Sequence, residues 1–208
     1  MGRILPTVLD TKVKNILSQE RSLAKTVASA VIDTPTLSVW DVAIPIIFLF
    51  NFLRFKRARE TFVLNFLFTK KMALEAAFAM VAKGRTREEA KVQIREKTGN
   101  LLAADKKGIY SSKIRQRQMN EIEILLDHYR KLLCAEGKDY SAMVKNAYRS
   151  QEEYRVFLKE LQRAEKAVNQ AAMQTVGTPS AERIVATMEE VPEKIRIAEI
   201  EKIFGWSR

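Results

Sequence analysis

A phenylalanine-rich segment is the feature that most constrains how this chain can fold. Eight of its ten phenylalanines lie between Val39 and Val81, and a basic cluster divides them. That cluster consists of Arg54, Lys56, Arg57 and Arg59. Burying one phenylalanine ring stabilises by roughly 1.5 to 3 kcal/mol, so a set of this size cannot remain in water. The segment must be covered by the protein's own core, by a partner, or by lipid.

The rest of the composition favours long helices. Only seven glycines and five prolines occur among 208 residues, whereas Ala, Leu, Lys, Glu and Arg are plentiful. No run shows the apolar–polar alternation of a half-buried strand, so we expect no β-sheet. We predict an all-α bundle of about five to seven helices from the periodicity of apolar residues. The long helices are expected near 7–32, 39–82, 112–136 and 150–176.

Prolines, glycines and capping residues predict where helices are interrupted. The 39–82 helix should break within the basic cluster, between Arg54 and Glu60, because a single rod of that length is improbable in a small protein. Thr86 begins a short helix with a capping box, and Gly99 is expected to end it. Pro192 is expected to end the penultimate helix, before a short last helix. Residues 1–176 should form the bundle, and 177–208 a helical extension that docks on it or on a partner.

Residues with catalytic or metal-binding potential are scarce. His128 is the single histidine and Cys134 the single cysteine, too few for the usual zinc ligand sets. Leu125 stands three residues before His128, where a helical di-iron site would need glutamate. No phosphate-binding loop is present. The sequence therefore predicts a non-enzymatic protein without cofactor or metal, in which the histidine is structural and the cysteine is a small buried apolar side chain.

The N-terminal residues and the cysteine content also predict a compartment. Residues 1–9 contain no apolar run after Arg3, so they do not resemble a secretory signal. A lone cysteine cannot form an intramolecular disulfide, which is typical of a reducing compartment. We expect a cytoplasmic protein that can lie at the inner face of the cell membrane.

The longest uncharged run, Val42–Leu53, leaves three arrangements open. Its twelve residues form a helix of about 18 Å, against a hydrocarbon thickness of roughly 30 Å. It can be a helix buried in the core or by a partner, a segment inserted shallowly in one leaflet, or a span if extended to Val39 and Phe55. The predicted insertion residues are Trp40, Ile46, Ile47, Phe48, Leu49, Phe50 and Phe52. The basic cluster would then contact anionic headgroups.

The chain carries a net charge of +11, and the excess lies in its first three quarters. Residues 1–150 hold 27 Lys or Arg against 15 Asp or Glu, while the remainder holds 9 against 10. One predicted basic face could bind a nucleic-acid backbone without sequence preference. It comprises Arg85, Arg87, Lys106, Lys107, Lys113, Arg115 and Arg117. Tyr110 is the single aromatic residue between Lys83 and Lys113, so base stacking is not expected.

Together these features predict a non-enzymatic helical interaction or scaffold protein, associated peripherally with a membrane through residues 40–59. Its expected partners are another protein or a second copy of itself, and an anionic membrane surface. One alternative is a basic helical protein that binds nucleic acid. The other is a bundle that shelters an apolar ligand in a closed cavity lined by the phenylalanines.

Overall fold

A computed structural model describes residues 6–32, 58–106, 108, 110–176 and 179–205. This part of the chain contains seven helices and no strand, which confirms the predicted all-α bundle. The helices are α1 (Pro6–Ile32), α2 (Ala58–Lys83), α3 (Arg87–Ala104), α4 (Ser112–Cys134), α5 (Tyr140–Ala147), α6 (Gln151–Val176) and α7 (Pro179–Phe204). The predicted long helices near 7–32, 112–136 and 150–176 correspond to α1, α4 and α6.

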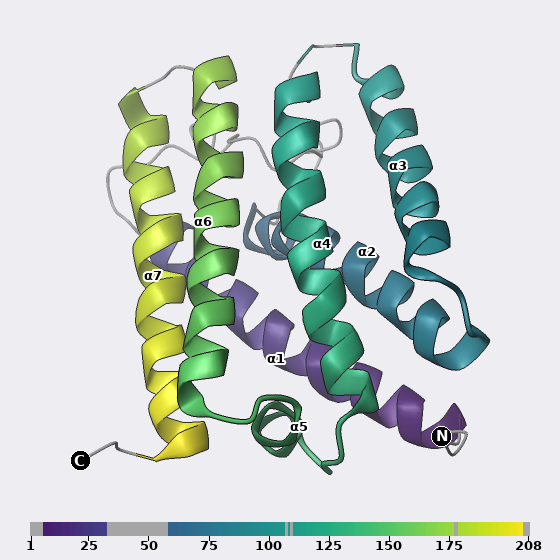
Figure 1. Cartoon of the computed structure of the whole chain (residues 1–208). Helices are drawn as coiled ribbons and strands as arrows, with labels where there is room; N and C mark the ends of the chain where they lie inside the picture. Colours follow the sequence, from purple (N-terminus) through teal and green to yellow (C-terminus); the bar gives the residue numbers. More distant parts are fainter. Residues whose placement is uncertain (1–5, 33–57, 107, 109, 177–178, 206–208) are drawn as a thin grey trace.

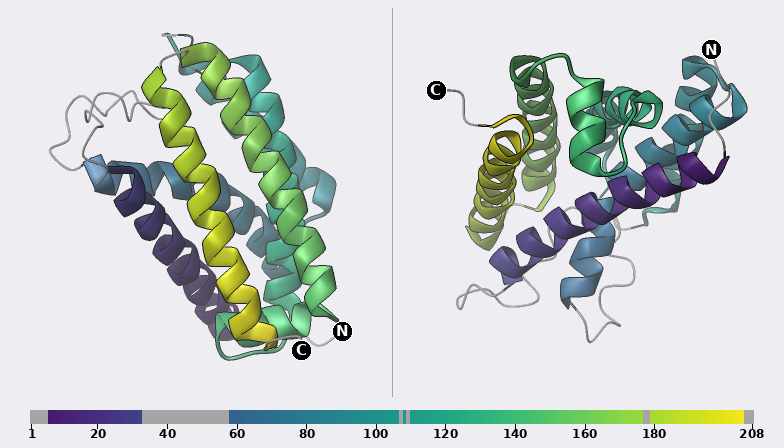
Figure 2. Two further views of the ribbon diagram at one scale, coloured as in Figure 1. Left: turned by 90° about the vertical axis from the view of Figure 1, so that its left-hand side faces the viewer. Right: turned by 90° about the horizontal axis from the view of Figure 1, so that it is seen from below.

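The helices form two layers around a shared core. α4, α6 and α7 run roughly along one direction, with α6 between the other two, and α1 and α2 cross behind them (Figure 1). The side view shows α6 and α7 lying together along most of their length, with α1 and α2 as the second layer (Figure 2). α4 and α6 run in opposite directions and pack directly on each other, and both contribute side chains to the largest core cluster described.

α2 is the central helix of the bundle. The helix carries apolar side chains on nearly every side, and its residues Leu67, Ala73 and Ala77 are almost fully buried. A helix that is apolar all round is stable in water only when other helices enclose it, and α1, α3 and α4 pack directly on α2. The phenylalanines of this helix are thereby accounted for: Phe62 is buried, and Phe66, Phe68 and Phe78 are partly buried against the core.

The predicted 39–82 helix agrees with α2 over its second half. α2 begins at Ala58, within the Arg54–Glu60 stretch where an interruption was predicted. Residues 39–57 lie outside the described residues, so the first half of the predicted helix and the break itself stay predictions.

Two predicted helix ends are wrong. α3 continues through Gly99 to Ala104, because α4 supports it there: the Arg115 guanidinium lies over Gly99 and donates to the Arg95 carbonyl oxygen at 2.9 Å. α7 likewise continues through Pro192 to Phe204. Packing on α1 and α6 compensates there for the hydrogen bond that proline removes from a helix.

The end of α4 also differs from the prediction. The helix ends at Cys134, with Ala135 as its C-cap, so Gly137 lies in the following loop. Gly137 has φ +147°, and a Cβ there would lie 2.6 Å from the Met143 backbone nitrogen, so the loop needs glycine. Cys134 is exposed, and its predicted burial is wrong, because the buried face of this last turn is formed by its neighbours Leu132 and Leu133.

The capping box of α3 is formed as predicted and gives a first test of the fold. The Glu89 N–H donates to Thr86 Oγ1 at 3.2 Å, and the Thr86 N–H donates to Glu89 Oε2 at 2.8 Å. We expect Thr86→Ala to lower the free energy of unfolding by about 1 kcal/mol in urea titrations, because the Glu89 N–H at the helix terminus loses its acceptor. Thr86→Ser keeps the acceptor and should stay close to wild type. An alanine variant as stable as the serine variant would contradict this role of the cap.

Candidate functional site

A groove lies over the C-terminal half of α2, and we call it the α1–α3 groove because these two helices form its walls. Its volume is about 580 Å³. Apolar side chains from all three helices line it: Val13, Leu17, Met72, Leu74, Ala76, Phe78, Ala79 and Ile94. Because the side chains of Ala76 and Ala79 are small, they leave space over α2 between α1 and α3.

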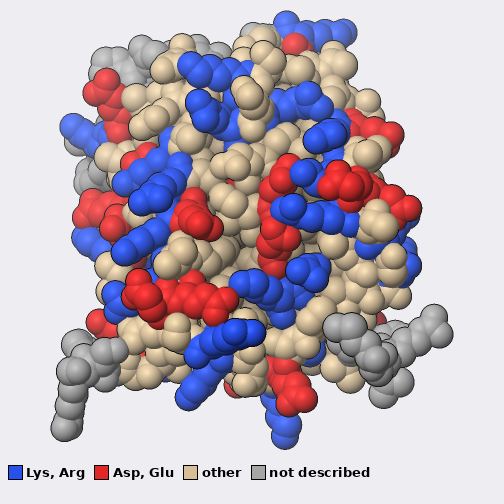
Figure 3. Space-filling view, viewed as in Figure 1, with Lys and Arg blue, Asp and Glu red and all other residues tan. Residues whose placement is uncertain are grey.

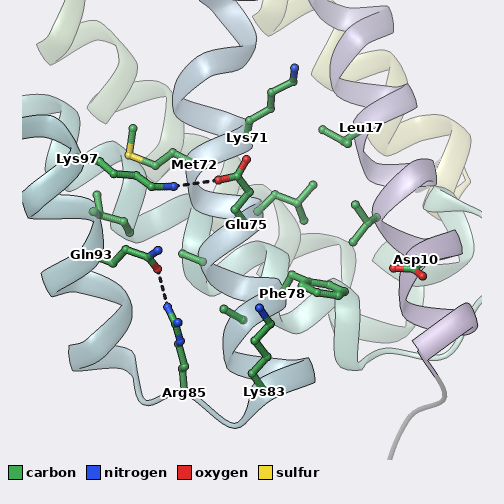
Figure 4. A pocket seen from close by; sticks show the side chains of 15 residues that line it. Asp10, Leu17, Lys71, Met72, Glu75, Phe78, Lys83, Arg85, Gln93 and Lys97 are labelled. Atoms are coloured by element: carbon green, nitrogen blue, oxygen red, sulfur yellow. Dashed lines mark hydrogen bonds and ion pairs between the residues drawn. The ribbon is translucent and has the colours of Figure 1, made fainter. Parts of the chain in front are cut away.

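Charged side chains form the rim of this groove, with an excess of cations. Four are basic and two are acidic: Lys71, Lys83, Arg85, Lys97, Asp10 and Glu75. Lys97 Nζ lies 3.1 Å from Glu75 Oε2, and Arg85 donates to the Gln93 side-chain oxygen at 2.8 Å (Figure 4). Within the described part of the chain, Lys83 and Arg85 have no carboxylate partner at ion-pair distance. One end of the groove therefore carries an excess of positive charge, although the Glu89 carboxylate interacts with Arg85 at longer range.

A second site is an ionic network buried where five helices meet. Lys70 on α2 lies 3.2 Å from Glu20 on α1 and 3.7 Å from Glu165 on α6. Arg196 on α7 donates two hydrogen bonds of 2.7 Å to the two Glu165 oxygens. Burial alone would lower the pKa of Lys70, but Glu20 and Glu165 outweigh it, so the pKa lies above its usual value. This arrangement ties both layers of the bundle together.

The Glu20 carboxylate interacts with two side chains, one through a hydrogen bond and one through charge alone. Tyr129 on α4 donates its hydroxyl hydrogen to Glu20 Oε1 at 2.8 Å. Glu20 Oε2 is near the Lys70 ammonium but accepts no hydrogen bond from a described residue. The attraction between these two charges is therefore Coulombic, without hydrogen-bond geometry.

Glu121 on α4 is the carboxyl group in this network that has no cationic partner within ion-pair distance among the described residues. Its side chain is buried beside a pocket of about 70 Å³ that Lys70 and Glu165 also line. Desolvation, together with repulsion from the Glu165 carboxylate, raises the pKa of Glu121 to about 8. At neutral pH it is mostly protonated, so Lys70 and Arg196 balance Glu20 and Glu165.

The single histidine belongs to an aromatic cluster. His128 is buried, its ring stacks on Phe157 with 4.1 Å between centroids, and its Nδ1 is 2.7 Å from the Tyr148 hydroxyl oxygen. Burial, with the positive charges of Lys70 and Lys131, lowers the pKa of His128 well below its ordinary value. The neutral, stacked ring is typical of a structural histidine. Among the described residues, no three His, Cys, Asp or Glu side chains are grouped as metal ligands would be.

All seven predicted membrane-insertion residues lie outside the described residues: Trp40, Ile46, Ile47, Phe48, Leu49, Phe50 and Phe52. Three of the four basic residues, Arg54, Lys56 and Arg57, lie outside them as well. Arg59 is described and is exposed in the first turn of α2. No described helix is long and apolar enough to cross a membrane.

The predicted nucleic-acid residues are divided between the two ends of α3. Arg85 and Arg87 are at its N-terminal end, and Arg87 is paired with Asp127 on α4 at 2.7 Å. The others that are described lie at or beyond its C-terminal end: Lys106, Lys113, Arg115 and Arg117; Lys107 is outside the described residues. On the face of α3, α4, α6 and α7 seen in Figure 3, basic and acidic side chains are intermixed. The predicted basic residues do not form one stripe.

Fold and sites together define an all-helical bundle with a buried ionic network and a groove with a basic rim. Comparisons with protein-family models, with curated proteins and with solved structures find no match to this chain.

Proposed function

We propose that this chain is a non-enzymatic helical interaction protein that associates with an anionic membrane surface through residues 40–59. The observation that carries the proposal is where this segment is joined to the bundle. Val31, near the end of α1, and Phe62, near the start of α2, belong to one apolar cluster with Ile184 and Val185 of α7. The chain therefore leaves and re-enters the bundle at the same corner.

This connection favours shallow insertion over a membrane span. A single crossing between α1 and α2 would put these helices on opposite sides of the bilayer, yet they share two apolar clusters. Two crossings would need about 40 residues, since each takes about 20. Residues 33–57 number 25. A segment that enters one leaflet and returns is compatible with both the length and the packing.

The charge distribution is compatible with the same proposal. The uncharged run ends at Leu53, and the next six positions hold four basic residues, Arg54, Lys56, Arg57 and Arg59. Each basic residue near an anionic surface contributes about 1 kcal/mol. Inside the bundle, buried charged side chains pair with one another across helices, Lys70 with Glu20 and Arg196 with Glu165. This pairing supports a structural role for these side chains.

Co-sedimentation of the full chain with vesicles tests the proposal. We expect binding to vesicles that contain anionic phospholipid and weak binding to zwitterionic ones. Phe50→Asp should lower the partition coefficient at least about tenfold, because it removes an apolar ring worth roughly 1.5 to 3 kcal/mol and adds a charge. Val156→Asp is the matched control, since Val156 is an exposed apolar residue on α6.

Two results would contradict membrane association through this segment. One is equal recovery with zwitterionic and anionic vesicles together with no change in Phe50→Asp. The other is an equal loss of binding in Val156→Asp, which would attribute the effect to the added charge alone.

A further inference from the structure

The α1–α3 groove has the size and lining of a ligand site. Its volume of about 580 Å³ falls within the roughly 300 to 1,000 Å³ typical of small-molecule sites. Its floor offers aliphatic side chains and the Phe78 ring, and the Glu75 carboxylate and the Gln93 amide line the groove as well. An apolar ligand, or the apolar part of one, would remove this floor from water.

The rim restricts the charge of such a ligand. Lys83 and Arg85 stand together at one end of the groove, and Phe78 separates them from Leu17 at the other (Figure 4). Lys97 is already neutralised by Glu75. A ligand with an anionic group at one end and an apolar chain would pair its charge with Lys83 and Arg85 while covering the floor.

The groove is too small to enclose a docked helix. A helix is about 10 to 12 Å across with its side chains, so even two turns occupy on the order of 1,000 Å³. A single hydrocarbon chain is much thinner and can follow the floor between α1 and α3. The volume also disfavours a lipid with two chains.

We propose that the α1–α3 groove binds a long-chain fatty acid, with the carboxylate at Lys83 and Arg85 and the hydrocarbon chain along Phe78 toward Leu17. This groove lies at the ends of α1 and α2 opposite the corner formed by Val31 and Phe62, and none of its described lining residues belongs to residues 40–59. It therefore does not depend on membrane association.

Calorimetric titration of the full chain with myristate, below its micelle-forming concentration, tests the site. The double variant Lys83→Glu with Arg85→Glu should weaken binding at least about tenfold, since one charged hydrogen bond is worth roughly 1.5 to 3 kcal/mol. The matched control is Lys145→Glu with Lys159→Glu, which makes the same change in net charge at exposed positions on α5 and α6. The control should bind within about twofold of wild type, because neither lysine lines the groove.

The ligand series tests the chemistry assigned to each end of the groove. Myristate methyl ester, which lacks the charge, should bind at least about tenfold more weakly than myristate. From laurate to palmitate, affinity should rise by up to about fourfold per added methylene, equivalent to 0.8 kcal/mol each.

Three outcomes would overturn the proposal. They are no binding of myristate, equal affinity for acid and ester, and unchanged affinity in the Lys83/Arg85 double variant. Phe50→Asp should bind myristate like wild type, so loss of vesicle binding and loss of fatty-acid binding can be told apart. Thermal unfolding of each variant checks that the bundle is intact.

Discussion

Lys70→Met is expected to lower the free energy of unfolding by about 3 to 5 kcal/mol, the usual cost of removing one partner from a buried ion pair. The Lys70 side chain is 4% exposed and lies between Glu20 and Glu165. Methionine fills a similar space but carries no charge. Within the part of the chain that the structure describes, Arg196 would then be the cation left to balance the two buried carboxylates of Glu20 and Glu165.

The adjacent lysine provides the matched control. Lys71 is partly exposed at the rim of the α1–α3 groove and forms no ion pair with a described residue. Lys71→Met should therefore change stability by about 0.5 kcal/mol or less. Urea denaturation of both variants gives the comparison, and equal midpoints would contradict the role assigned to the buried network.

A double-mutant cycle tests whether the loss comes from the pair. If Lys70→Met acts by leaving Glu20 uncompensated, its cost should be smaller in a Glu20→Gln background. Residues in one buried network usually couple by about 0.5 to 3 kcal/mol. Strict additivity would indicate that the methionine variant is destabilised by altered packing instead.

Helix positions were predictable from the sequence because they depend on local features. Three- and four-residue spacing of apolar side chains located α1, α4 and α6, and Thr86 marked the start of α3. Gly99 and Pro192 were misread because contacts with α4, α1 and α6 maintain the helix through them. Such contacts involve residues distant in sequence, which propensity does not describe.

The buried network was missed, although the sequence contains a signal for it. Glu20 lies four residues after Ile16 and four before Ala24, both buried, so it occupies an apolar register of α1. Glu165 likewise follows the buried Leu161 by four residues. A charge at an apolar register indicates a buried partner. The identity of that partner depends on how α1, α2 and α6 pack, which periodicity alone cannot predict.

The α1–α3 groove could not be predicted for a related reason. Its residues come from three helices, and each is consistent with an ordinary core or surface position when considered alone. What creates the groove is that α1 and α3 both pack on α2 while small alanines lie between them.

Glu121→Gln is expected to remove a pH dependence of stability that the buried carboxyl group causes. The pKa of Glu121 is about 8 in the folded protein, raised from an ordinary value of 4.5. Between these two values the unfolded chain releases the proton that the folded protein retains. The Glu121 carboxyl group therefore lowers the free energy of unfolding increasingly as pH rises from 4.5 to 8. The slope is up to about 1.4 kcal/mol per pH unit. Above the folded pKa both states are ionised and the slope disappears.

The quantity to measure is the difference in unfolding free energy between Glu121→Gln and wild type, from urea titrations at several pH values. Subtraction removes the contributions of His128 and Glu199, which are common to both proteins. The unfolding free energy of the variant relative to wild type should rise by several kcal/mol between about pH 5 and pH 8, because folded wild type retains the Glu121 proton over this range. Glu123→Gln, which removes a partly exposed carboxylate of α4 that pairs with Lys91 on α3 at 3.0 Å, should differ from wild type by about 1 kcal/mol or less. A constant difference across this range would mean that Glu121 is ionised in the folded protein, and that Lys70 and Arg196 together balance three buried carboxylates.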